Sequence, residues 1–194
     1  MKIGILGGTF NPPHLGHRFI LEQFASQINF DKILVIPTFI PPHKHSDELI
    51  ESCQRIKMCR LAFSDMDNLE VSTIEIDRKG KSYTFDTLRQ IKKQYPHSEL
   101  FFVMGSDMFK SFKQWYRYED ILSLCKICTC ERYENENSKD FFPEFDGKII
   151  YSNAPAFEVS SSEIREKIKN GDDVSSLLCM NVYGFIMKEG LYSK

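Results

Sequence analysis

Short apolar runs alternate with longer amphipathic segments along the chain. The runs at 2–6, 32–36 and 100–104 are almost entirely apolar, as in strands buried on both faces of a parallel sheet. Between the first two runs, one helical face carries Leu15, Phe19, Ile20, Phe24 and Ile28. This alternation predicts an α/β fold, a doubly wound parallel sheet with helices on both faces.

The same patterns predict the remaining elements. Further strands are expected at 70–76, 126–130 and 148–151, helices at 48–63, 85–95, 118–124, 162–169 and 175–187, and loops at 37–47 and 133–147. No repeat or composition shift divides the 194 residues. We therefore expect a single domain, residues 1–194, with a C-terminal helical segment at about 160–194.

Charge and targeting signals narrow the classes of partner. The 25 Lys and Arg residues nearly balance the 27 Asp and Glu residues, for a net charge of −2, which argues against coating nucleic acid or an anionic membrane. The N-terminal apolar run is far too short for a signal peptide, and no segment approaches the ~20 residues needed to cross a bilayer. A cytoplasmic location is expected.

Six cysteines raise the question of a metal or redox site. The densest group is Cys125, Cys128 and Cys130, but no second CxxC and no downstream HxxxH pair accompanies it, as a zinc site would usually require. Alternation along 126–130 puts Cys128 and Cys130 on one face of a strand. Buried apolar thiols are the expected state, and a metal or redox site is the alternative.

The first apolar run leads into GGTFNPPHLGH, residues 7–17, where doubly wound folds bind phosphates. The segment is neither a dinucleotide fingerprint nor a Walker A loop. Gly7 and Gly8 allow close backbone approach, and His14 and His17 lie on one side of a helix's first turn. The spacing fits an anion site, with a helix-capping histidine plus a buried one as the alternative, and a zinc pair lacking further ligands as another.

Two more segments carry candidate cations. The prolines of Pro41-Pro42-His43-Lys44 stiffen a loop at the same sheet edge and present Lys44, which could also be an ordinary surface lysine. Ser160 and Glu163 have capping-box spacing, so Arg165 falls near the start of a helix. A guanidinium there suits an anion, although a surface arginine is the alternative.

Taken together, these motifs resemble the nucleotidylyltransferases with an HxGH signature, distant relatives of the class I aminoacyl-tRNA synthetases. Within that group the chain is most similar to the bacterial nicotinate mononucleotide adenylyltransferases. The match covers essentially the whole chain, with Asn11 where the family often has Asp and Ser162 where it usually has Thr. The matching segments, in family order, are GGTFNPPHLGH, PPHK, SYTFDTL (82–88), Gly105-Ser106-Asp107, Gln114-Trp115-Tyr116, SSSEIR (160–165) and Glu189-Gly190-Leu191-Tyr192.

The resemblance implies a Rossmann-like nucleotidylyltransferase fold and an enzyme of NAD biosynthesis. Such an enzyme transfers AMP from ATP, with Mg²⁺ on its phosphates, to nicotinate mononucleotide, giving nicotinate adenine dinucleotide and pyrophosphate. It implies no nucleic-acid or membrane partner and no metal ligands in the protein, and it leaves a homo-oligomer open. The implied catalytic residues are His14, His17, Lys44 and Arg165.

The resemblance also implies the binding residues. ATP would be bound by Gly7, Gly8, Thr9, Phe10, His14, His17, Gly105, Asp107, Ser161 and Arg165. The mononucleotide would be bound by Lys44, Thr84, Trp115 and Arg132. Thr84 would lie at the nicotinate carboxylate and Trp115 on the pyridine ring, where a partly buried anchor is the alternative for the tryptophan.

Other functions remain to be weighed against this one. A nicotinamide mononucleotide or phosphopantetheine adenylyltransferase shares the scaffold, but the second usually has Thr in place of His14, and SYTFDTL with Trp115 favours the acid substrate. A nucleotide-binding regulator or a metal or thiol sensor is the non-enzymatic alternative. The presence of His14, His17, Lys44 and Arg165 argues against an inactive protein.

Overall fold

The computed structural model describes residues 1–41, 49–130, 145, 147–152 and 159–193. Over these residues six strands form one sheet in the order β3-β2-β1-β4-β5-β6, and every neighbouring pair is parallel. This confirms the doubly wound α/β prediction. The strands are β1 (Lys2–Gly8), β2 (Lys32–Pro37), β3 (Leu69–Val71), β4 (Glu99–Met104), β5 (Lys126–Cys130) and β6 (Ile149–Ser152).

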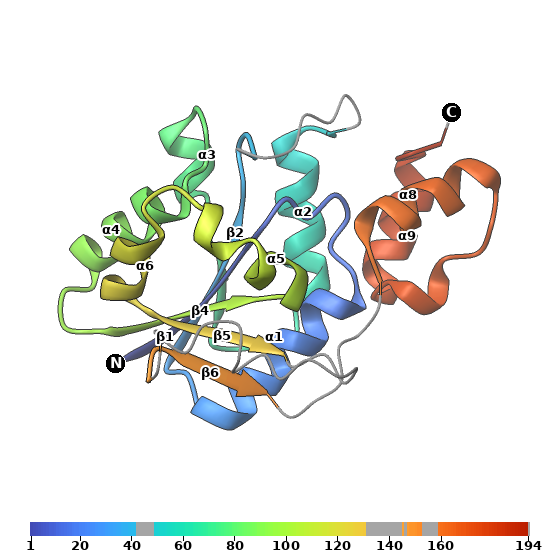
Figure 1. The fold of residues 1–194 in the computed structure, drawn as a ribbon. Helices are drawn as coiled ribbons and strands as arrows, with labels where there is room; N and C mark the ends of the chain where they lie inside the picture. The colour runs from blue at the N-terminus through green and yellow to red at the C-terminus, as the bar shows by residue number, and fades with distance from the viewer. Residues whose placement is uncertain (42–48, 131–144, 146, 153–158, 194) are drawn as a thin grey trace.

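Helices cover both faces of the sheet (Figure 1). One face carries α1 (Leu15–Ile28), α2 (Ser52–Ala62), α8 (Ser161–Asn170) and α9 (Met180–Glu189). The other carries α4 (Thr84–Gln94), α5 (Ser106–Lys110), the 3₁₀ turn η1 (Phe112–Gln114) and α6 (Tyr118–Leu124). The short helix α3 (Ile74–Arg78) follows β3, and the 3₁₀ turn η3 (Ser175–Leu177) precedes α9.

Alternating strand residues build two separate cores. In β4, Phe101 and Val103 pack against α1 and the C-terminal helices, whereas Phe102 and Met104 pack against α4 and α6. This two-faced burial is why the strands read as continuous apolar runs in the sequence.

The cysteines follow the same alternation. Cys128 and Cys130 lie buried in the core beneath α1, and Cys125 is buried on the opposite side. Burial raises the pKa of the Cys125 thiol to about 12 and raises that of Cys128 as well. The expectation of buried, free thiols is confirmed, and thiols with such pKa values are poor nucleophiles.

Several predicted boundaries are wrong. The strand expected at 70–76 ends at Val71, and Ile74 begins α3. The prediction was wrong because Ile74 and Ile76 alternate with polar residues as in a strand, whereas only Ile74 is buried. The helix expected at 48–63 begins at Ser52. The helix expected at 175–187 is a 3₁₀ turn followed by an extended Leu178 and then α9.

Other predictions were incomplete. The short helical turns of residues 106–114 were not predicted at all. Most of the loops expected at 37–47 and 133–147 lies outside the described residues, and the single-domain organisation stays a prediction.

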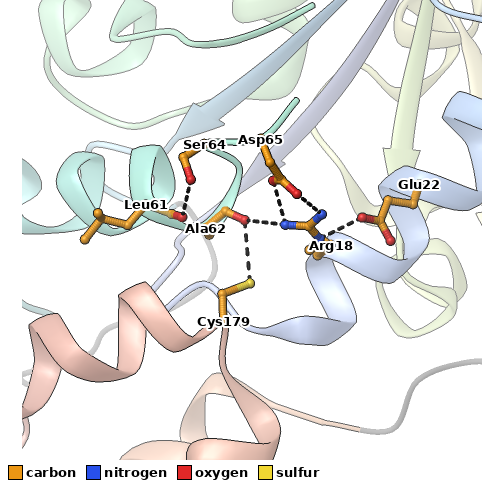
Figure 2. A network of polar contacts seen from close by, with 7 residues as sticks. All are labelled: Arg18, Glu22, Leu61, Ala62, Ser64, Asp65 and Cys179. Carbon is orange, nitrogen blue, oxygen red and sulfur yellow. Dashed lines mark hydrogen bonds and ion pairs between the residues drawn. The ribbon is translucent and has the colours of Figure 1, made fainter. Parts of the chain in front are cut away.

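One arginine joins α1 to the end of α2. Arg18 donates two hydrogen bonds to the Asp65 carboxylate, one to the Ala62 carbonyl and one to Glu22 (Figure 2). Cys179, just before α9, donates its thiol to the same Ala62 carbonyl at 3.5 Å. Because Arg18 directly follows His17, this network fixes the helix that starts with the histidine pair.

Candidate active site

The carboxyl ends of β1 and β4 meet at the point where the strand order reverses. β1 pairs with β2 on one side and with β4 on the other. Open α/β sheets bind ligands in the crevice at such a switch point. A cavity of about 980 Å³ lies here, and its wall includes both the GGTFN segment and the residues that follow β4.

The two histidines of the HLGH turn stand side by side. His14 occupies the N-cap of α1, and its ring centroid is 3.7 Å from that of His17. The Nδ1 atom of His17 accepts the backbone N–H of His14 at 3.2 Å. In a neutral ring the proton therefore lies on Nε2, which makes His17 Nε2 a hydrogen-bond donor.

His14 is held neutral by its surroundings. Its side chain is only 8% exposed, and burial lowers its pKa from 6.5 to about 4. Among the described residues, nothing hydrogen-bonds its Nδ1 atom. A buried polar atom without a partner is costly, so His14 is poised to gain from a polar group that enters the cavity.

Gly16 permits the close packing of this turn. A Cβ atom at Gly16 would lie 3.0 Å from Val159 and 3.1 Å from the His14 ring. Phe10, itself buried, packs its ring edge-on to His17 at 5.0 Å. The glycine thus lets the segment before α8 approach the histidines directly.

The start of α8 closes over the same loop. The Ser160 hydroxyl accepts the Glu163 N–H and caps the helix, as the capping spacing predicts. Ser161 donates its hydroxyl to the Pro12 carbonyl at 2.8 Å, and Arg165 donates to the Asn11 carbonyl at 2.9 Å. Both Ser161 and Arg165 line the cavity beside the histidines.

The far wall of the cavity belongs to the other half of the sheet. Thr84 is the first residue of α4, and no side chain among the described residues caps that helix. Trp115 is half-buried, with its ring edge-on to Phe102 and Phe112 at 6.0 and 5.6 Å. Both Thr84 and Trp115 line the cavity.

The structure brings most of the predicted site residues together. The described members line this one cavity, and they are Gly7, Gly8, Thr9, Phe10, His14, His17, Thr84, Gly105, Asp107, Trp115, Ser161 and Arg165. Lys44 and Arg132 lie outside the described residues. The roles assigned to individual residues stay predictions.

Sequence reasoning missed a set of buried polar residues behind this site. The Tyr192 hydroxyl donates to Asn11 Oδ1 at 3.0 Å, so the end of the chain contacts the GGTFN segment. Arg55 of α2 donates to the Thr9 carbonyl at 2.8 Å. Arg55 had a signal in the sequence, since it shares a helical stripe with Met58 and Cys59.

Glu75 is a second missed feature, and it lines the same wall of the cavity as Thr84. Its side chain is buried and accepts the Thr87 hydroxyl at 2.6 Å, while Arg78 donates to Thr87 Oγ1 at 2.9 Å. Burial raises the pKa of the Glu75 carboxyl. The group fixes the first turns of α4, where Thr84 lies.

No group of three or more His, Cys, Asp or Glu side chains within the described residues is arranged to hold a metal ion. None of the helices within them combines the length and the apolar character that a bilayer crossing requires.

Comparison with known proteins gives consistent results. The model of the cytidylyltransferase-like family matches residues 5–167. A nicotinate-nucleotide adenylyltransferase from Bacillus subtilis is 35% identical over 191 residues, which cover 98% of both chains. A probable nicotinate-nucleotide adenylyltransferase from Enterococcus faecalis is 37% identical over 98% of this chain and 84% of its own.

A solved structure shares the fold. The Plasmodium falciparum nicotinic acid mononucleotide adenylyltransferase complexed with NaAD superposes with a TM-score of 0.82. The alignment covers 98% of this chain and 97% of that one, at 20% identity.

Proposed function

Because this chain belongs to the cytidylyltransferase-like family, and within it to the nicotinate-nucleotide adenylyltransferases, we propose that it adenylylates nicotinate mononucleotide. The AMP unit of ATP passes to the mononucleotide phosphate, and the products are nicotinate adenine dinucleotide and pyrophosphate, in NAD biosynthesis. The observation that carries this proposal is the cavity at the β1–β4 switch point, which gathers two histidines, an arginine and two helix starts.

The reaction needs alignment more than proton transfer. A phosphate oxygen of the mononucleotide attacks the α-phosphorus of ATP, the bond from that phosphorus to the bridging oxygen breaks, and pyrophosphate leaves with the electron pair. The second ionisation of a phosphate monoester lies near pH ~6, so the nucleophile is already charged. The protein supplies orientation and hydrogen-bond donors for the charge that develops.

His14 and His17 form the centre of the site in this proposal. His17 Nε2 donates to a phosphate oxygen, because its Nδ1 atom is occupied by the His14 N–H. The neutral His14 ring lies against it. Together they hold the triphosphate at the start of α1, where the helix dipole also favours an anion.

Further groups complete the ATP site in this proposal. Arg165 and Ser161 bind phosphate oxygens at the start of α8, and Lys44 bridges toward the mononucleotide. The Gly7–Phe10 backbone cradles the adenosine side, while Gly105 and Asp107 bind its ribose. Each of these except Lys44, which is not described, lines the cavity.

The acid substrate is selected at the start of α4. The first N–H groups of a helix have no partners within the helix, and no side chain caps α4 among the described residues. A nicotinate carboxylate at Thr84 accepts from these groups and gains from the helix dipole, whereas an amide gains less. Trp115 stacks on the pyridine ring, and Arg132 is assigned to the same pocket.

The divalent cation enters with the substrate. We propose that ATP binds as its Mg²⁺ complex, with the ion held by phosphate oxygens. We also propose a cytoplasmic enzyme without nucleic-acid partners, in keeping with the net charge of −2, and leave a homo-oligomer as a matter for measurement.

A labelling experiment tests the reaction type. The enzyme is incubated with Mg²⁺, nicotinate mononucleotide and ATP labelled at the α-phosphorus, and the products are separated by chromatography. We expect the label in the dinucleotide and unlabelled pyrophosphate in equal amount. Label that stays in ATP, or appears as free AMP at the rate of pyrophosphate release, would contradict the proposal.

A further inference from the structure

A buried arginine of α2 contacts the loop after β1 that contains Thr9. Arg55, in the first turn of α2, is 1% exposed and is the largest of the fully buried side chains. Its guanidinium donates from Nη1 to the Thr9 carbonyl at 2.8 Å and from Nε to the Ile50 carbonyl at 3.2 Å. Both acceptors are backbone atoms.

Among the described residues, no carboxylate balances this charge. Within the described part of the chain, the titratable groups that interact with Arg55 are Cys59 and Tyr192, and burial raises the pKa of both. Both are therefore neutral at physiological pH. An arginine keeps its proton in proteins, and a buried charge without a partner costs several kcal/mol.

The Thr9 contact also fixes one peptide group. The C=O and N–H of a planar trans peptide point in opposite directions, so a Thr9 carbonyl held by Arg55 turns the Phe10 N–H to the other side of the loop. Thr9 and Phe10 line the cavity and Arg55 does not, from which we infer that the Phe10 N–H faces the cavity side of the loop. Among the described residues, no acceptor takes up this N–H.

Ile50 joins the same arrangement. Its carbonyl accepts from Arg55 Nε, and its N–H donates to Asn11 Oδ1 at 3.5 Å. Tyr192 also donates to Asn11 Oδ1. Arg55 therefore holds the loop from the side away from the cavity, whereas Asn11, His14 and His17 line the cavity.

We propose that Arg55 is a positioning residue for the adenylyl transfer, which orients the Phe10 N–H toward the bound ATP and supplies a buried positive charge that the triphosphate neutralises. The proposal rests on the proposed function for its substrate. It accounts for a buried cation whose hydrogen-bond acceptors, among the described residues, are backbone carbonyls: the opposing charge arrives with ATP.

Two substitutions at Arg55 distinguish the effect of its positive charge from the effect of its hydrogen-bond geometry. R55K keeps the charge but cannot reproduce the paired Nε and Nη1 contacts, whereas R55M removes both. R60M is the control, because Arg60 is an exposed arginine on the same helix. The readouts are the Kd for α,β-methylene-ATP by calorimetry, kcat and KM for each substrate, and the thermal melting curve.

We expect R55K to bind the analogue within about threefold of wild type and to lose about tenfold in kcat. R55M is expected to bind about tenfold more weakly as well. KM for the mononucleotide should stay unchanged in both variants, and R60M should match wild type throughout. If R55M does not fold, R55K against R60M carries the test.

A failure of the Arg55 proposal can be distinguished from a failure of the proposed function. A folded R55K with wild-type kcat overturns the orienting role, and a folded R55M that binds the analogue as R55K does overturns the charge role. A lower melting temperature with unchanged kcat and Kd shows a merely structural arginine. If wild type binds the analogue but does not use nicotinate mononucleotide, the proposed function fails while the binding measurements still decide on Arg55.

Discussion

His14 and His17 lie in the same helical turn but in different environments. The His14 ring is buried and neutral, with its Nδ1 atom unpartnered among the described residues. His17 is half-buried, and its tautomer is fixed by the His14 backbone. The difference assigns them different tasks, because a fixed donor holds a phosphate oxygen while a buried ring supports and shields the donor.

Replacement of His17 tests its role as the donor. His17→Ala should lower kcat by about 10²-fold, the typical loss when one donor to a developing charge is removed. Steady-state measurement of pyrophosphate release gives the value. His97→Ala, at an exposed histidine between α4 and β4, is the control. A turnover equal to wild type would remove the His17 imidazole from the mechanism.

The burial of His14 predicts a pH dependence of stability. The unfolded chain protonates this histidine below its ordinary pKa of 6.5, whereas the folded chain does so only near 4. Between these values the unfolded state binds more protons, so the free energy of unfolding falls as the pH falls. The slope from this one group reaches at most about 1.4 kcal/mol per pH unit.

Urea unfolding between pH 4 and 8 measures this effect. His14→Gln removes the titrating ring and should give a flatter curve below pH 6.5 than wild type, with no difference in slope above pH 7. Parallel curves across the whole range would show that His14 is not buried as a neutral ring.

Among single residues, the sequence indicated those that line the cavity but not Arg55 and Tyr192, which support the cavity wall from outside it. The HxxH spacing and the SSSEIR segment are local patterns with a chemical meaning. Arg55 reads as one charged residue on a helix, and its position among Met58 and Cys59 becomes informative only once that stripe is known to be buried. Tyr192 reaches Asn11 across 181 positions of sequence, which no local pattern reveals.

Among the elements, α1 and α6 match their predicted bounds, and their sequences show why. The apolar spacing in α1 is regular over four turns, and it ends at Asn29 in the left-handed conformation. By contrast, α3 and α5 have five residues each, too few for a helical period to stand out from alternation. Packing against the sheet, which sequence patterns do not report, decides such short elements.

The attachment of α1 to α2 predicts a stability effect. Arg18→Met removes the bonds to Asp65, Ala62 and Glu22 and should cost about 1 kcal/mol, since the guanidinium is partly exposed and its bonds are partly screened. Denaturant unfolding with a fixed slope measures the cost. Glu22→Gln breaks only the exposed i,i+4 pair and should cost less than half as much; equal costs would show that the contacts to the end of α2 add nothing.

Over the whole molecule, the C-terminal segment packs against the N-terminal part of the chain. The C-terminal helices pack in the core that α1 and α2 share, and Figure 1 shows α8 and α9 on the side of α2. Arg165 and Tyr192 both contact Asn11, one at its carbonyl and one at its side chain. These contacts tie the C-terminal segment to the wall of the cavity.

The Tyr192 contact predicts that the C-terminus supports nucleotide binding. Tyr192→Phe loses the hydrogen bond to Asn11 and should cost about 1 kcal/mol of stability, with weaker binding of α,β-methylene-ATP by a few fold. Calorimetry and thermal melting check the two effects. Tyr183→Phe, a half-buried tyrosine of α9, should change neither. Nucleotide affinity equal to wild type in Tyr192→Phe would show that this contact only closes the fold.

Substrate preference shows whether the enzyme adenylylates the acid mononucleotide. The most direct measurement compares kcat/KM for nicotinate mononucleotide, nicotinamide mononucleotide and phosphopantetheine with MgATP in one pyrophosphate-release assay. A carboxylate held by the first turn of α4 predicts at least about tenfold preference for the acid over the amide and no turnover of phosphopantetheine. Equal or greater kcat/KM for the amide, or turnover of phosphopantetheine alone, would contradict the account.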